Sequence, residues 1–136
     1  MKLKPLKKKK TAIRFLKAIF PAWGLRAIWK LFHKEKQSKF FFQAEKNKKI
    51  LGIMAISSVV FWGLRWLHLR FFVVDSKWRG KGVGTEMLEN LEKKAQKTNH
   101  RFIFLTSKPF RNKAHRFYLK NGFKRVLWFF FWKKIK

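Results

Sequence analysis

A glycine-spaced stretch at residues 73–84, V-V-D-S-K-W-R-G-K-G-V-G, constrains this chain more than any other feature. An apolar run at residues 70–74 predicts a strand that leads into the stretch, and the pattern behind it predicts a helix over residues 85–95. Alternating glycines let a ligand approach the backbone closely, and the first N–H groups of a helix have no partner within it. Together these features predict a site for a phosphate or pyrophosphate group.

Two common phosphate-binding motifs do not fit this stretch. A P-loop requires G-x-x-x-x-G-K-[ST], and the sequence has no such spacing. A dinucleotide fingerprint requires G-x-G-x-x-G and then an acidic residue about twenty positions on. After Gly80 and Gly82 the third glycine comes one position early, and no acidic residue follows Glu92. Both interpretations are therefore excluded.

A third pattern, R-x-x-G-x-G, is present at Arg79, Gly82 and Gly84, and A-x-x-F-Y-x-x-x-G-F begins downstream at Ala114. On these two motifs, found in this order, the sequence resembles the GNAT N-acetyltransferases over roughly residues 40–123. The resemblance implies an α/β (α+β) fold of the GNAT acyltransferase type. Such a fold has a mixed central sheet with two splayed strands, flanking helices and, in this chain, a shortened C-terminal hairpin.

The resemblance also implies that the glycine turn binds acetyl-CoA, the acyl donor. The turn residues whose backbone would hold the coenzyme pyrophosphate are Arg79, Gly80, Lys81, Gly82, Val83 and Gly84. The backbone of Val73 and Val74 matches the strand edge that pairs with the pantetheine arm, and its N–H groups would polarise the thioester carbonyl. Asn112 lies one residue closer to the second motif than the family's asparagine, so it either contacts the coenzyme arm or caps the following helix.

Two residues are candidates for proton transfer. Tyr118, the single tyrosine beside 17 phenylalanines, matches the family position that protonates the coenzyme A thiolate; the alternative is a packed ring with a hydrogen bond at its tip. His68 occupies the place of the family's carboxylate base and could accept the amine proton through a water molecule. Strand alternation places His68 on one face with Phe72 and Val74. A merely packed histidine and base catalysis by water remain alternatives for this position.

A cationic surface is expected beside the tyrosine. His115 should face solvent or the coenzyme phosphates, and its neighbours Arg111, Lys113 and Arg116 could hold the adenosine 3′-phosphate. No metal is expected. The regularly spaced glutamates of the helix at residues 85–95 are interpreted as a solvent-exposed helix face and not as metal ligands.

Composition bounds the remaining possibilities. The 136 residues are 47% hydrophobic and include no cysteine, which predicts one folded domain over residues 11–136 and excludes disulfides and a cysteine nucleophile. The net charge of +29 favours polyanionic partners, namely nucleic acid, anionic lipid and phosphorylated metabolites such as coenzyme A. Compositional drift is the alternative explanation of this charge.

The first third of the chain carries weaker signals. Lysine-rich residues 1–10 predict a mobile basic arm. Apolar residues at helical spacing predict amphipathic helices over residues 12–20 and 25–36, which either pack on the sheet or form a cationic hairpin in a membrane interface. A first strand is hard to find, because residues 11–16 could form it only at the expense of the first helix.

The remaining strands follow from apolar runs between turn signals. They are expected at residues 40–45, 50–60, 66–74 and 101–106. Gly122 is placed to end the helix that carries Tyr118. Residues 123–132 then leave room for little more than one strand, so the acceptor side is either open or completed by another subunit.

These inferences predict an acetyl-CoA-dependent N-acetyltransferase, an acyltransferase in which a primary amine attacks the donor directly in a ternary complex. The absence of cysteine agrees with direct attack. The acceptor is not identified, although a basic surface favours an amine carried on an anionic molecule. The alternative is a weakly active or inactive protein of this fold that binds nucleic acid or an anionic membrane. The expected location is cytoplasmic, with peripheral membrane contact and a homodimer left open.

Overall fold

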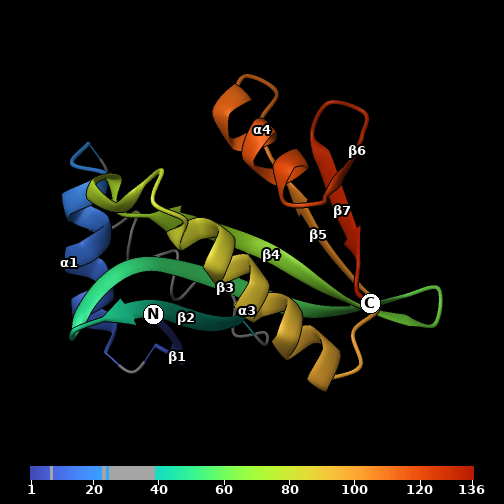
Figure 1. Ribbon diagram of the computed structural model, residues 1–136, viewed down its shortest axis with the longest axis horizontal. Coiled ribbons are helices and arrows are strands. Elements are labelled where there is room, and N and C mark those ends of the chain that lie inside the picture. Colours follow the sequence, from blue (N-terminus) through green and yellow to red (C-terminus); the bar gives the residue numbers. More distant parts are fainter. Residues whose placement is uncertain (7, 23, 25–38) are drawn as a thin grey trace.

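A computed structural model of the chain describes residues 1–6, 8–22, 24 and 39–136 (Figure 1). In this part the strands are β1 (Lys2–Pro5), β2 (Lys39–Lys46), β3 (Lys49–Phe61), β4 (Leu64–Val74), β5 (Phe102–Thr106), β6 (Lys124–Val126) and β7 (Phe130–Lys134). The helices are α1 (Lys9–Ile19), α3 (Val83–Lys97) and α4 (Asn112–Lys120), with a 3₁₀ turn, η1 (Ser76–Trp78), before α3. None of these helices is both long and apolar enough to cross a bilayer.

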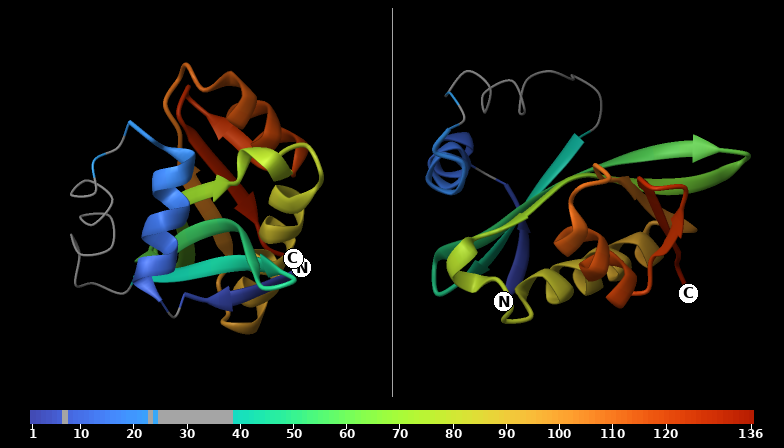
Figure 2. Two further views of the ribbon diagram at one scale, coloured as in Figure 1. Left: turned by 90° about the vertical axis from the view of Figure 1, so that its left-hand side faces the viewer. Right: turned by 90° about the horizontal axis from the view of Figure 1, so that it is seen from above.

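The strands form one mixed sheet in the order β1-β2-β3-β4-β5-β7-β6. Every neighbouring pair is antiparallel except β4 and β5, which run parallel. Parallel neighbours need a crossover, and α3 supplies it. Helices α3 and α4 lie on one face of the sheet and α1 lies on the other (Figure 2). The predicted mixed sheet with flanking helices is confirmed.

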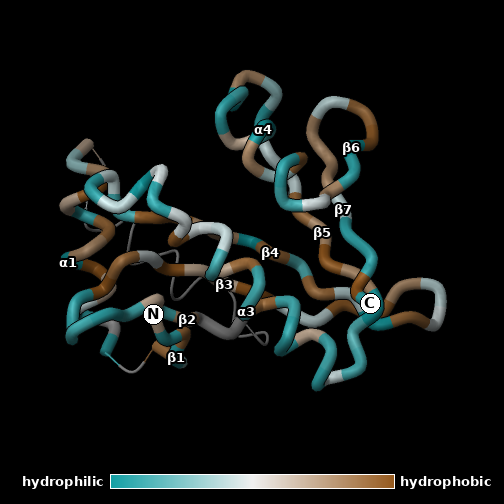
Figure 3. The backbone as a smooth tube through the Cα atoms, in the orientation of Figure 1, coloured by the Kyte–Doolittle hydropathy of each residue, from teal (hydrophilic) through white to brown (hydrophobic). Residues whose placement is uncertain are grey.

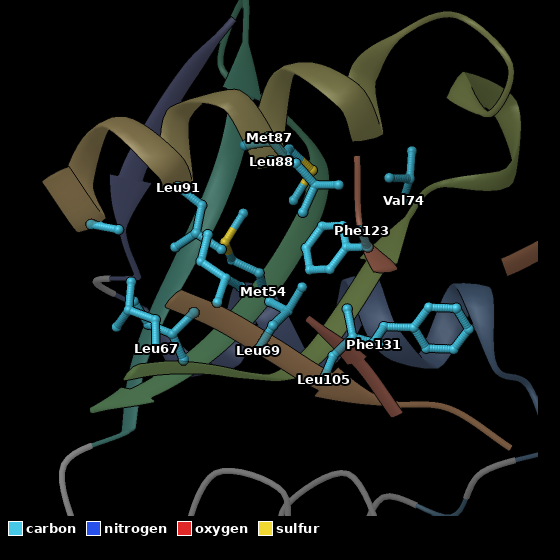
Figure 4. Close-up of a cluster of buried hydrophobic side chains, with 14 of the residues drawn as sticks. Met54, Leu67, Leu69, Val74, Met87, Leu88, Leu91, Leu105, Phe123 and Phe131 are labelled. Carbon is cyan, nitrogen blue, oxygen red and sulfur yellow. The ribbon is translucent and has the colours of Figure 1, made fainter. Parts of the chain in front are cut away.

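In the described ranges, two apolar cores hold these layers together. The main core lies between the sheet and helices α3 and α4, and its members include Met54, Leu67, Leu69, Met87, Leu91, Leu105, Phe123 and Phe131 (Figure 4). A smaller core joins α1 to the opposite face, where Ala12 and Leu16, one helical turn apart, pack with Ile53 and Val73. Hydrophobic stretches accordingly recur along β3, β4 and β5 (Figure 3). The amphipathic helix predicted over residues 12–20 is confirmed by α1.

The start of the chain is not the mobile arm that its lysines suggest. Residues 2–5 form β1, which pairs antiparallel with β2 from Lys2 opposite Glu45 to Pro5 opposite Phe42. Leu3 packs against the main core while the lysines on either side stay exposed. An apolar residue flanked by lysines therefore forms an edge strand in this chain. The exposed lysine charges on this edge also discourage pairing with strands of other chains. This strand, rather than residues 11–16, is the first one; the helix expected over residues 25–36 lies outside the described residues.

The C-terminal hairpin is shortened, as expected, and its two strands occupy a stretch in which the sequence left room for little more than one. β6 and β7 form a short hairpin, and β7 also pairs with β5, from Phe102 opposite Lys134 to Thr106 opposite Phe130. The turn between them contains no glycine, proline or asparagine, and Leu127 adopts the left-handed conformation at φ 59°. Because the turn is as apolar as the strands that it joins, its sequence gives no turn signal.

Candidate functional site

The glycine-spaced stretch carries the chain from the end of β4 through η1 into α3 (Figure 1). Gly80 and Gly82 have φ angles of 74° and 83°, a region that glycine adopts without strain. A Cβ atom added at either glycine would meet no atom within 4 Å. The turn is therefore open on its outer side and not filled by neighbouring side chains.

Unpaired backbone donors lie at the same turn. Gly82 is the N-cap of α3, and no side chain caps the helix. Among the described residues, the N–H groups of Val83, Gly84 and Thr85 donate to no backbone carbonyl. The positive end of the helix dipole adds to these donors. The arrangement is chemically suited to an anionic group.

The other motif residues are held by the protein itself. The Nε atom of Arg79 donates a 3.0 Å hydrogen bond to the carbonyl oxygen of Val74, which ties the turn to the end of β4. At Gly84 an added Cβ would lie 2.9 Å from Cζ of Phe117 in α4. Gly84 therefore lets α3 and α4 approach each other, whereas Gly80 and Gly82 leave space outside the protein.

Strands β4 and β5 pair briefly and then part. Their parallel ladder ends where His68 lies opposite Phe104. β4 continues to Val74 and remains paired on its other side with β3. Within the described residues, the edge of β4 near Val73 and Val74 therefore has no strand partner on the side of β5. The predicted splaying of these two strands is confirmed.

A β-bulge interrupts the alternation of side chains along β4. The pairing with β3 shifts by one residue between Leu69 and Phe71. Leu69 and Phe72 both pack in the main core, which strict alternation would not allow. His68 therefore lies on the opposite face from Phe72 and Val74. The prediction that these three residues share a face is wrong, because a bulge reverses the alternation beyond it.

His68 is half-buried in a row of aromatic rings. Its ring stacks on Phe104 of β5, with centroids 4.4 Å apart and planes inclined by 10°. Phe104 stacks in turn on Phe130 of β7 at 5.7 Å. His68 is thus fixed at the last paired position before β4 and β5 separate. Its role as a base remains a prediction.

Tyr118 is carried by α4 into a largely buried position. Its ring centroid lies 5.5 Å from that of Phe131 and 5.9 Å from that of Phe123. Burial raises the pKa of the Tyr118 phenol above its ordinary value of 10.0, and the positive charge of Arg111 partly opposes the rise. The phenol is therefore protonated at neutral pH, as a general acid has to be before it acts.

The start of α4 differs from expectation in two places. Arg111 is the N-cap, Asn112 is the first helical residue, and no side chain caps the helix. The capping role suggested for Asn112 is therefore wrong, and its contact with the coenzyme arm remains a prediction. His115 is only 4% exposed, and its ring lies 4.9 Å from that of Phe131. The expectation that His115 faces solvent or phosphate is also wrong, because it shares the buried helix face with Tyr118 three residues on.

The sequence matches the model of the acetyltransferase (GNAT) family over residues 10–123. This chain belongs to the GNAT acetyltransferases. The glycine turn, the parted strands and Tyr118 all fall within the matched range, so the resemblance inferred from the two motifs is confirmed. A comparison with curated proteins gave no match.

Solved GNAT structures superpose on nearly the whole chain. A GNAT acetyltransferase from Staphylococcus aureus is 18% identical with a TM-score of 0.80, and the alignment covers 99% of each chain. Tetrahymena GCN5 is 15% identical with a TM-score of 0.77, over 100% of this chain and 97% of that one. An aminoglycoside 6′-N-acetyltransferase complexed with coenzyme A is 16% identical with a TM-score of 0.75, over 100% and 98%. At these identities the likeness shows the GNAT fold.

The sequence did not point to a hollow that this GNAT fold forms at the carboxyl end of β5. The hollow has a volume of about 440 Å³ and is lined by Thr106, Ser107, Lys108, Pro109, Arg111 and Phe129. Ser107 is 8% exposed, and its hydroxyl has no hydrogen-bond partner in the described part of the chain. The positive charge of Arg111, which lines the hollow, also acts on the pKa of Tyr118. Serine and lysine are common in loops, so their presence in the sequence does not predict a hollow. No cluster of metal-binding side chains occurs among the described residues.

Proposed function

We propose that this chain is an acetyl-CoA-dependent N-acetyltransferase, in which a primary amine attacks the donor directly in a ternary complex. The observation that carries the proposal is the open glycine turn at the start of α3, adjoining the unpaired edge of β4. Membership of the GNAT family supports acyltransferase activity, and one structural neighbour is complexed with coenzyme A.

The turn binds the coenzyme pyrophosphate through its backbone. The donors are the N–H groups of residues 80–85, which donate to no backbone carbonyl in the described part of the chain, and the exposed Lys81 adds a positive charge. The unpaired edge at Val73 and Val74 pairs with the amides of the pantetheine arm. One N–H group of this edge then polarises the thioester carbonyl, because it is aimed at the oxygen on which negative charge develops. Asn112, exposed at the start of α4, contacts the same arm.

Acetyl transfer requires one bond to form and one to break. The neutral amine nitrogen attacks the thioester carbonyl carbon, forming a C–N bond, and the resulting tetrahedral intermediate expels the thiolate of coenzyme A. The hydroxyl of Tyr118 donates its proton to this thiolate. The imidazole of His68 accepts the proton that the amine nitrogen loses, directly or through a water molecule. The products are the N-acetylated amine and the free thiol of coenzyme A.

The two faces of the sheet separate donor from acceptor. Tyr118 packs with the main core, on the face of α3 and α4, whereas His68 lies on the opposite face. The donor thiol therefore approaches from the side of the helices and the amine from the side of α1. The parted strands between them allow the two reactants to meet.

The acceptor is an amine carried on an anionic molecule. The net charge of +29 repels polyamines and basic peptides. Turnover of acetyl-CoA against matched acidic and basic amines tests this preference, and faster turnover of the basic amines would contradict it.

A second candidate function is supported by the net charge alone. In this case a protein of the GNAT fold binds a polyanion and catalyses acetyl transfer poorly or not at all. Calorimetry with coenzyme A and a turnover assay on a panel of amines separate the two. Binding of coenzyme A together with turnover supports the transferase. Binding of coenzyme A without turnover of any amine supports the second function, and absence of coenzyme binding contradicts the transferase.

A further inference from the structure

The β3–β4 hairpin extends beyond the rest of the sheet (Figure 2). Pairing between β2 and β3 reaches only to Ser57, and pairing between β4 and β5 begins only at Trp66. Among the described residues, the segment between these positions is a two-stranded projection. In this part of the chain no further strand and no helix pairs with it or covers it.

The tip of this projection is apolar. Its large side chains are all exposed, with relative accessibilities of 37% for Val59, 70% for Val60, 58% for Phe61, 85% for Trp62 and 38% for Leu64. An exposed hairpin usually alternates polar and apolar residues, so that only one face needs cover. Residues 59–64, the hairpin tip, instead present apolar side chains in succession. A contiguous exposed apolar surface of this kind marks an interaction site.

The backbone conformation at the apex of the hairpin is unfavourable for tryptophan, the residue that occupies it. Trp62 and Gly63 form a two-residue turn with φ angles of 55° and 71°. Turns with both central φ angles positive favour Asn-Gly, and a bulky residue in this conformation is an outlier. Tryptophan at the apex therefore does not serve the turn itself, and strain of this kind is typical of functional positions.

Basic residues surround the base of the hairpin tip. The N–H group of Arg101 donates to the carbonyl of Arg65, and the N–H group of Ile135 donates to the carbonyl of Arg101. The exposed side chains of Arg65, Arg101, Lys134 and Lys136, the basic collar, are thereby gathered where the hairpin leaves the sheet. The hollow at this end of the molecule is lined by no acidic side chain.

We propose that the hairpin tip inserts into the interface of an anionic membrane, with the basic collar on the lipid headgroups. Tryptophan and phenylalanine are suited to the interface, aliphatic side chains to the acyl boundary, and arginine and lysine to anionic headgroups. Nucleic acid fits less well, because Val59, Val60 and Leu64 cannot stack on bases. A second copy of the chain fits less well too, since it carries the same net charge of +29. Attachment of this kind goes beyond acetyl transfer and does not depend on it.

The test is cosedimentation with phosphatidylcholine vesicles, with and without phosphatidylserine, at low and at physiological salt. We expect binding to the phosphatidylserine vesicles that weakens as salt rises. Trp62→Asn should lower the partition coefficient about tenfold, because an interfacial tryptophan is lost. The same substitution places the preferred residue at the turn, so the melting temperature should stay equal or rise. Replacing Arg101 and Lys134 by glutamine should weaken binding about fivefold for each residue, on anionic vesicles only.

Trp128→Asn is the matched control, since Trp128 is 70% exposed on the separate β6–β7 turn. Its vesicle binding should equal that of the unmodified protein. Three results would overturn the proposal: no binding to anionic vesicles, undiminished binding by Trp62→Asn, or an equal loss in the Trp128 variant. Two other results would overturn it as well, provided that vesicle binding stays unchanged. One is that Trp62→Asn abolishes binding to a single-stranded oligonucleotide, and the other is that it abolishes self-association in sedimentation.

Discussion

Gly84→Ala offers a quantitative test of how α3 is placed above the candidate site. The added Cβ would lie 2.9 Å from Cζ and 3.2 Å from Cε2 of Phe117, whereas carbon atoms prefer separations of about 3.5–4.0 Å. Phe117 also stacks on Phe72 of β4 with ring centroids 5.9 Å apart, so it has little freedom to withdraw. Overpacking of this kind costs about 1–3 kcal/mol, offset by about 0.5–1 kcal/mol because alanine favours a helix over glycine.

Because Phe72 holds Phe117, the cost should lie in the upper part of this range, at about 2–3 kcal/mol. The net expectation for Gly84→Ala is then a loss of about 1–2 kcal/mol in the free energy of unfolding, or about 3–7 °C in melting temperature. Urea denaturation of four proteins measures it: the unmodified chain, Gly84→Ala, Phe117→Leu and the double variant. Because leucine is shorter than phenylalanine, Gly84→Ala should cost much less in the Phe117→Leu background. Equal costs in the two backgrounds, or a Gly84→Ala protein as stable as the unmodified one, would refute the argument that this glycine is required for helix packing.

Two further predictions concern titratable groups. Tyr118→Phe should lower kcat for acetyl transfer about a hundredfold, because the variant lacks the acidic proton. The Kd for coenzyme A should stay unchanged, because the packing of the ring is kept. An unchanged kcat would show that Tyr118 is not the general acid. Burial, and secondarily Arg65, lowers the pKa of His100 below its ordinary value of 6.5. Below pH 6.5 the unfolded chain therefore binds more protons than the folded one, so stability should fall as the pH falls from 6.5. Thermal melts across this range measure the effect, which His100→Gln should remove; the same slope in that variant would contradict the assignment.

The features that came from local motifs were predicted correctly. The glycine turn, the helix behind it and the splaying of β4 from β5 followed from the pattern at Arg79, Gly82 and Gly84 and from the resemblance that it carries. Spacing alone could not distinguish the roles of the three motif positions. Gly82 leaves an open surface, whereas Gly84 faces Phe117, and only the packing of α3 on α4 reveals this difference.

The features that depend on tertiary pairing were missed. The face of His68 depends on a bulge that exists only in the register of β4 against β3. Burial of His115 depends on β7 lying beneath α4. The hairpin was expected, but the position of its turn was not, because Leu127 bends the chain without a turn residue. The first strand was missed because lysine dominates its composition, although Leu3 alone is enough to seat it on the core.

The central claim is that the open turn at the start of α3 binds the diphosphate of coenzyme A. Calorimetric titration with coenzyme A should show binding at one site, and Gly82→Val should abolish it, since a side chain at this N-cap would occupy the space beside the free N–H groups. Thermal melts have to show that the variant is folded, because valine at φ 83° is strained. Binding by a folded Gly82→Val protein with unchanged affinity, or no binding by the unmodified chain, would contradict the claim.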